Sequence, residues 1–139
     1  MSHFKKIETE FKQGTSLVQA LKDLGYTPRV APDLKVNSLA ATDFYGHQLP
    51  CAVKVDRHEF GGFTDLGFAW DAESKTYSAA VDNWDAYSTS QTGKLNKIKQ
   101  RYAVNEAKRL ARLQGYSLQE QALPDGSVRL VCTSYAGGY

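Results

Sequence analysis

The sequence predicts an α+β fold in which two main helices pack on one face of an antiparallel sheet. Two segments, 15–24 and 93–114, repeat apolar residues at helical spacing, and a glycine that can end a helix follows each of them. Several shorter segments alternate apolar and polar residues, which is typical of half-buried strands. Polar turn signals at 71–75 and 124–127 join neighbouring strands as hairpins and favour antiparallel pairing.

The size of the chain suits a single domain. It has 139 residues, of which 42% are apolar and 23% are charged, an ordinary globular composition. A chain of this length can bury roughly two thirds of its unfolded surface, so a core can form without disulfides or metals. We therefore expect residues 1–139 to form one domain, with 134–139 as a flexible tail.

The N-terminal part of the chain predicts a strand, a helix and a second short strand. Residues 2–11 place apolar and β-branched side chains among charged ones, as a strand does. A Gly-Thr-Ser run then ends the strand and offers a hydroxyl cap to helix 15–24. Residues 26–30 are predicted as a short extended segment. Because Pro28 removes a backbone donor, any strand here lies at a sheet edge or ends quickly. Residues 31–50 are predicted as mostly loop, with a short helical or extended piece as the alternative.

The middle of the chain predicts three strands, at 51–56, 63–70 and 76–81. The glycines at 61–62 could cradle a phosphate, but a strand comes after them instead of a helix N-terminus, which favours a glycine hairpin or bulge. Residues 83–93 are polar and are predicted as a loop. This loop carries two large aromatic residues, Trp84 and Tyr87, which either cover the core or anchor an interface.

The helix at 93–114 is the clearest element. Its predicted core stripe consists of Leu95, Ile98, Tyr102, Leu110 and Leu113, with Ala103 and Ala107 as small contacts. Strands are predicted after it at 116–121 and 128–133. Both helices end in a glycine followed by a tyrosine that opens a strand. This shared pattern is either an ordinary way to end a helix or the sign of two β-α-β-like halves.

Charge is distributed unevenly along the chain. The net charge is only +2, but residues 94–112 contain seven basic residues against the single acid Glu106, while residues 56–91 are mainly acidic. We expect a basic face and an acidic face. The candidate binding residues on the basic helix are Lys97, Arg101, Lys108, Arg109 and Arg112.

Three interpretations of this basic helix remain open. Its cations can form a solvated outer face, bind an acidic protein surface or bind nucleic-acid phosphates. Arg101, Lys108 and Arg112 share one side of the helix, whereas Arg109 and Arg112 also complement the helix dipole. No known nucleic-acid-binding motif supports the third interpretation.

The sequence contains no phosphate-binding loop, dinucleotide fingerprint, zinc-protease motif, nucleophile elbow or CxxC pair. We therefore expect no catalytic residues, no enzyme activity and no cofactor. His47, Cys51 and His58 are weak metal candidates, because their spacing fits no established ligand pattern. The two cysteines, Cys51 and Cys132, are expected to be small buried side chains. The absence of a signal sequence or a membrane span predicts a cytoplasmic or stromal protein.

Six segments carry a family resemblance when they are taken in order: MSHF, LKDLGY, DLGFAWD, DNW, LNKIKQRYAVNEAKRLARLQGY and PDGSVRLV. With them, nearly the whole chain resembles the hypothetical chloroplast reading frame thirty-five family of cyanobacteria and plastids, a domain of unknown function. The resemblance implies a cyanobacterial or plastid-related source, with bacterial and phage versions possible, and it implies no reaction. It also implies an adaptor or assembly role, since such families are sometimes encoded near AAA-type ATPases.

These observations leave three functional hypotheses. The first is a non-enzymatic accessory or adaptor protein that acts through protein contacts, with an AAA-type ATPase as one candidate partner. The second is nucleic-acid binding through the basic helix at 94–112. The third is an unfamiliar enzyme or ligand carrier that uses residues 47–63. The oligomeric state stays open.

Overall fold

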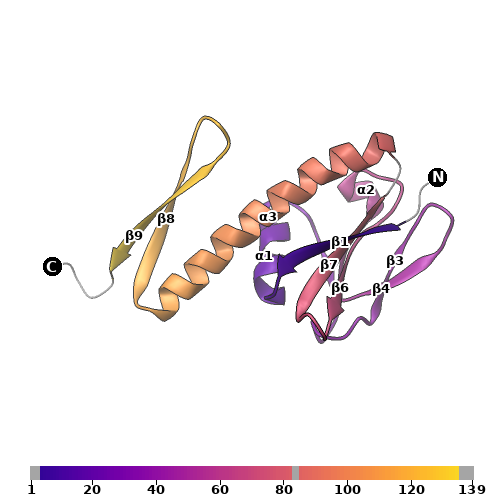
Figure 1. Cartoon of the computed structure of the whole chain (residues 1–139), viewed down its shortest axis with the longest axis horizontal. Helices are drawn as coiled ribbons and strands as arrows, with labels where there is room; N and C mark the ends of the chain where they lie inside the picture. Colours follow the sequence, from indigo (N-terminus) through magenta and orange to yellow (C-terminus); the bar gives the residue numbers. More distant parts are fainter. Residues whose placement is uncertain (1–3, 83–84, 135–139) are drawn as a thin grey trace.

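The computed structural model describes residues 4–82 and 85–134, and these residues confirm the α+β fold (Figure 1). The elements follow the chain in the order β1 Phe4–Phe11, α1 Gly14–Asp23, β2 Arg29–Val30, β3 Leu39–Thr42, β4 Gln48–Cys51, β5 Val53–Val55, α2 Arg57–Phe60, β6 Leu66–Asp71, β7 Thr76–Asp82, α3 Asp85–Leu113, β8 Tyr116–Ala122 and β9 Val128–Ser134.

The main layer is a five-stranded antiparallel sheet with the strand order β1-β7-β6-β5-β2. Register places Phe68 opposite Val53 on one side and Ala79 on the other, so these side chains share one face of the sheet. Leu17 of α1 and Ile98 of α3 are fully buried in the same apolar cluster. Both main helices therefore cover one face of the sheet, as the sequence predicts.

The other face of β6 is covered by the hairpin of β3 and β4. The sequence predicts mostly loop here, because residues 31–50 contain Pro32, Asn37, Gly46 and Pro50. However, Pro50 is exposed and pairs with Ala40 in the register of a two-stranded sheet, where a proline is tolerated. Gly67 of β6 permits the approach: a Cβ atom at this position would lie 2.9 Å from the Cβ of Ala41. The alternative of a short extended piece within 31–50 is confirmed.

A short helix, α2, replaces the glycine hairpin or bulge predicted before β6. Asp56 caps it by accepting a 2.8 Å hydrogen bond from the backbone N–H of His58. Gly61 ends it with φ 87°, a conformation that favours glycine. Only four residues are helical, too few for apolar periodicity to reveal them.

Helix α3 begins at Asp85, so the predicted loop at 83–93 is wrong for residues 85–93. This part of the helix lacks apolar residues at helical spacing, and periodicity alone could not extend the helix there. Tyr87 lies in the first turn of α3, whereas Trp84 lies outside the described residues. At 29 residues α3 is long, but no helix within the described ranges is apolar enough to cross a membrane.

The predicted core stripe holds only as far as Tyr102 of α3. Leu95, Ile98 and Tyr102 are buried, whereas Leu110 is 49% exposed and Leu113 is 73% exposed. A helix of 29 residues spans about 44 Å at 1.5 Å per residue, longer than the strands it packs on. The C-terminal turns of α3 therefore extend past the sheet, and Leu110 and Leu113 find no core beneath them.

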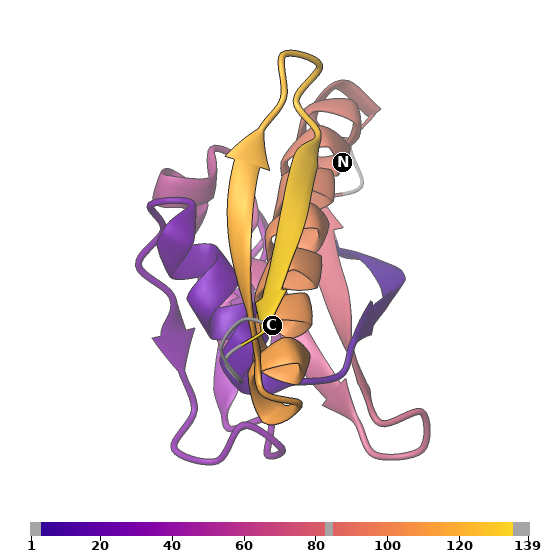
Figure 2. The same ribbon diagram turned by 90° about the vertical axis from the view of Figure 1, so that its left-hand side faces the viewer.

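The C-terminal hairpin of β8 and β9 forms a separate two-stranded sheet, with register from Tyr116↔Ser134 to Ala122↔Val128. It runs back along the side of α3 that faces away from the five-stranded sheet (Figures 1 and 2). In the first half of the chain the strands of the unit β1-α1-β2 both belong to the five-stranded sheet. In the second half, β7-α3-β8, only β7 belongs to it, because β8 pairs with β9 in the separate hairpin. The length of α3 explains this difference, because it carries Gly115 beyond the reach of the sheet.

Candidate functional site

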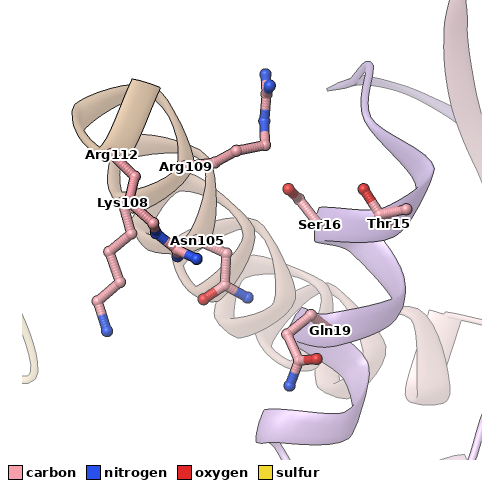
Figure 3. A pocket seen from close by; sticks show the side chains of 7 residues that line it. All are labelled: Thr15, Ser16, Gln19, Asn105, Lys108, Arg109 and Arg112. Atoms are coloured by element: carbon pink, nitrogen blue, oxygen red, sulfur yellow. The ribbon is translucent and has the colours of Figure 1, made fainter. Parts of the chain in front are cut away.

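The candidate site is a basic groove between α1, the second half of α3 and the start of β8. Its first part is a hollow of about 200 Å³ lined by Thr15, Ser16, Gln19, Asn105, Lys108, Arg109 and Arg112 (Figure 3). Its second part is a hollow of about 210 Å³ lined by Lys108, Arg112, Tyr116, Ser117 and Leu118. Lys108 and Arg112 belong to both hollows, which makes them the common wall of the groove.

The contact between α1 and α3 fixes the floor of the groove. The backbone N–H groups of Lys12 and Gln13 donate to the hydroxyl of Tyr102, at 2.9 and 3.0 Å, and so hold the start of α1 against α3. Asn105 donates to Asp23 at the far end of α1, at 3.2 Å. These contacts tie both ends of α1 to α3, so the groove between the two helices is preformed.

Glu106 is the acidic group beside the first hollow. Arg109 donates two hydrogen bonds to it, Nε to Oε1 at 2.9 Å and Nη2 to Oε2 at 3.0 Å, and the buried hydroxyl of Ser16 donates a further one. The bonds from Arg109, followed by the one from Ser16, lower the pKa of Glu106 below its usual value. Two donors of Arg109 are therefore engaged with an internal carboxylate.

Glu120 of β8 is the second internal partner of the basic helix. Arg101 Nη2 donates to its Oε1 at 2.5 Å, and Lys108 Nζ donates to the same oxygen. These two hydrogen bonds, that of Arg101 first, lower the pKa of Glu120 to about 2. The Nε atom of Arg101 also lies 3.7 Å from the Oδ2 atom of Asp23. The hairpin is thus fastened to α3 by charge-assisted bonds.

The structure brings together some of the predicted basic residues and separates others. Arg101 and Lys108 share a side of α3, as predicted, since both reach Glu120. Lys97 is exposed outside the groove. Arg112 is exposed, and within 4–82 and 85–134 no acidic side chain pairs with it. Part of the positive charge of α3 is therefore neutralised by carboxylates of the protein itself.

The sequence could have predicted the ion pair of Glu106 but not that of Glu120. Glu106 and Arg109 are three residues apart, a spacing that brings side chains together on a helix, so their pair could have been predicted. Glu120 lies 19 residues from Arg101 and on a strand, and no local pattern links the two. Only the position of the hairpin on α3 does so.

The weak metal candidates do not form a site. Cys51 is fully buried, and burial raises the pKa of its thiol to about 11. His47 lies on an exposed turn with its Nδ1 3.0 Å from Asp43, and His58 is on α2. Within the described ranges no three His, Cys, Asp or Glu residues are placed to hold a metal. Cys132 is exposed, which contradicts the predicted burial of both cysteines.

The interface aromatics cannot be placed at this groove. Trp84 lies outside the described residues, and of Tyr87 only the helical backbone is described. The aromatic residue that lines the groove is Tyr116, which is 40% exposed and belongs to the second hollow. It is the tyrosine that comes after the glycine end of α3, and Gly115 has the expected positive φ, 81°.

Comparison with known proteins defines the family. The family model described as "Protein of unknown function (DUF1257)" matches residues 20–131, which include all of α3 and β8. The chain is also 25% identical over 132 residues to "Uncharacterized protein ycf35" of Pyropia yezoensis, a similarity that covers 94% of this chain and 95% of that protein. No solved structure matches the chain significantly. The resemblance drawn from the residues is confirmed, and the chain belongs to the DUF1257 family of proteins of unknown function.

Proposed function

We propose that the protein is a non-enzymatic adaptor that holds an acidic segment of a partner protein in the basic groove. The observation that carries the proposal is Arg112, an exposed cation without an acidic partner among the described residues, on the wall shared by both hollows. Such a cation favours a negatively charged partner by charge complementarity.

The apolar residues around Arg112 support a protein partner. Tyr116 is 40% exposed within the groove, and Leu118 lies half-buried beside it. Leu113, the neighbour of Arg112 in the chain, is an apolar residue that is 73% exposed. Tyrosine and arginine beside exposed apolar side chains are typical of the central part of protein interfaces.

A binding role accounts for the polar groups of the groove better than catalysis. Ser16 and Glu106 are in contact, the arrangement of a nucleophile and its base. However, the pKa of Glu106 is lowered chiefly by its bonds from Arg109, so its carboxylate is a poor acceptor for a proton. The pair instead serves to join α1 to α3.

Nucleic-acid binding is the second candidate, and the geometry favours it less. A nucleic-acid site needs several free cations that follow a backbone of phosphates. Among the described residues, the α3 cations with neither an ionic partner nor a backbone carbonyl acceptor are Lys97, Lys99 and Arg112. At 100° per residue Lys99 points away from the other two, which are themselves about 22 Å apart along the helix.

The test compares capture of partners by three forms of the tagged protein. Partners bound from a native lysate of the source organism are measured by quantitative mass spectrometry for the wild type, Arg112→Glu and the control Lys99→Glu. Lys99 is exposed on another side of α3, so its variant changes the net charge equally without touching the groove. We expect Arg112→Glu to lose acidic partners by at least about tenfold and Lys99→Glu to retain them.

Retention of every partner by Arg112→Glu contradicts the proposal. Purified AAA-type ATPases of the same organism form a directed arm of the test, because the family resemblance makes them candidate partners. Titration with single- and double-stranded oligonucleotides at low and high salt forms the other arm. Binding that weakens steeply with salt would favour nucleic acid over an acidic protein segment.

A further inference from the structure

A further hollow lies at the opposite region of the fold, between the β3–β4 turn and the segment that joins α2 to β6. Its volume is about 370 Å³, and it is lined by Phe44, Arg57, His58, Gly62 and Phe63. We call it the tip pocket. None of its residues takes part in the basic groove, so a ligand bound there is independent of the adaptor proposal.

The aromatic residues Phe44 and Phe63 line the tip pocket, and the ring of Phe44 is open to solvent. Phe44 is 55% exposed and its turn neighbour Tyr45 is 52% exposed. The ring of Phe44 packs edge-on against Phe63, with centroids 5.5 Å apart, and against Tyr45 at 5.3 Å. A cluster of large rings left exposed on a turn is a common feature of binding sites, because a ligand can cover the rings.

Two buried carboxylates hold the walls of the pocket in place. Asp43 is 1% exposed and accepts hydrogen bonds from the backbone N–H groups of Tyr45, at 2.9 Å, and His47, at 2.8 Å. Asp65 is 5% exposed and accepts from the backbone N–H groups of Thr42 and Arg57, both at 2.9 Å. The two walls are therefore joined through Asp65, and the pocket is preorganised for a ligand.

The side chains of Arg57 and His58 are free to bind a ligand. Arg57 uses its backbone N–H for Asp65 and His58 uses its backbone N–H for Asp56, so neither bond involves the side chain. Among the described residues no acidic group pairs with the Arg57 guanidinium or the His58 imidazole. A half-buried arginine without a carboxylate is suited to an oxyanion, which it can bind through two parallel hydrogen bonds.

We propose that the tip pocket binds a nucleotide: a planar base against the exposed ring of Phe44 and its phosphate at Arg57 and His58. Bases stack on aromatic side chains with little dependence on their identity, and arginine prefers phosphate. The volume suits one nucleotide and is small for an extended dinucleotide. The ligand can be a free nucleotide or the end of a single strand, since both present the same ring and phosphate.

The first experiment measures binding of AMP, adenosine and inorganic phosphate to the full chain by isothermal titration calorimetry. AMP is expected to bind at least tenfold more tightly than either fragment, because only AMP reaches both the ring of Phe44 and the side chains of Arg57 and His58. A 5′-phosphorylated oligonucleotide distinguishes the two sources: tighter binding than AMP identifies a single strand, and equal or weaker binding identifies a free nucleotide. Absence of AMP binding at millimolar concentration overturns the proposal.

The second experiment repeats the titration with variants. Arg57→Ala and Phe44→Ala are each expected to weaken AMP binding at least tenfold, whereas Arg112→Ala in the basic groove leaves it unchanged. Phe44 is already 55% exposed, so its variant should fold, and circular dichroism with thermal unfolding checks this. A Phe44→Leu variant keeps apolar contact but removes the ring, and it should bind AMP as weakly as Phe44→Ala. Equal AMP affinity of the wild type and Arg57→Ala also overturns the proposal.

Discussion

We predict that Glu120 stabilises the packing of the C-terminal hairpin against α3. An isolated two-stranded hairpin is marginally stable in water, so β8 and β9 depend on their contact with the helix. Glu120 provides the ionic part of this contact, because its carboxylate accepts from both Arg101 and Lys108. The substitution Glu120→Gln keeps the size of the side chain, removes its charge and leaves the two cations facing each other.

The expected loss is about 1 kcal/mol in the free energy of opening the hairpin. The pKa of Glu120 is lowered to about 2, which indicates strong pairing, but its side chain is 27% exposed and solvent screens the interaction. Partly exposed ion pairs contribute roughly 0.2–1 kcal/mol each, so two pairs on one carboxylate give about 1 kcal/mol. This corresponds to roughly fivefold faster hydrogen exchange of the β8 and β9 amides at pH 7.

The pH dependence of the hairpin depends on the direction in which the pKa of Glu120 moves. This pKa is lower in the folded protein than in the open state, so the contribution of Glu120 is complete above the ordinary value of about 4.3. It is lost as the pH falls from there towards about 2. Hairpin protection in the wild type should therefore decrease across this window, and the Glu120→Gln variant should lack this part of the decrease.

Hydrogen exchange with mass spectrometry, corrected for the intrinsic rate at each pH, measures both effects. Glu73→Gln is the matched control, because Glu73 is an exposed carboxylate on the β6–β7 turn, far along the chain from the hairpin. The control should exchange like the wild type. Unchanged exchange in β8 and β9 of Glu120→Gln at pH 7 would refute the reasoning, as would hairpin protection that does not vary between pH 5 and 2.5.

Three further predictions concern the core and the cysteines. Leu95→Ala should lower the free energy of unfolding by about 2–5 kcal/mol in chemical denaturation, whereas the exposed Leu113→Ala should change it by less than about 0.5 kcal/mol; equal effects would contradict the boundary of the core. Gly67→Ala should cost about 1–3 kcal/mol, because its methyl group would overlap the β3–β4 hairpin, and a stability equal to the wild type would disprove that close approach. A thiol reagent should modify Cys132 in the native protein but reach Cys51 only after unfolding, since Cys51 is buried with its pKa raised to about 11; rapid reaction of two thiols in the native state would show otherwise.

The sequence was sufficient for the elements whose pattern is local. Gly25 and Gly115 have the positive φ values, 91° and 81°, that the predicted helix ends require. Leu95 and Ile98 lie in the core because helical spacing places them on one face. The extent of the core along α3 is a different kind of property. It depends on where the sheet ends beneath the helix, and nothing near Leu110 or Leu113 encodes that limit.

The same distinction explains why the basic helix differs from its sequence pattern. Counting charges along 94–112 gives a strongly positive segment, because the count includes only neighbours in the chain. In the folded protein Asp23 and Glu120 approach this helix from α1 and β8 and neutralise part of it. Among the described residues, the α3 cations left without an acidic partner or a backbone carbonyl acceptor are Lys97, Lys99 and Arg112, and of these three Arg112 lines the basic groove. A local run of charge therefore overestimates a binding face whenever other elements pack along the helix, and the proposed contact is placed at Arg112 because this unpaired cation lines both hollows.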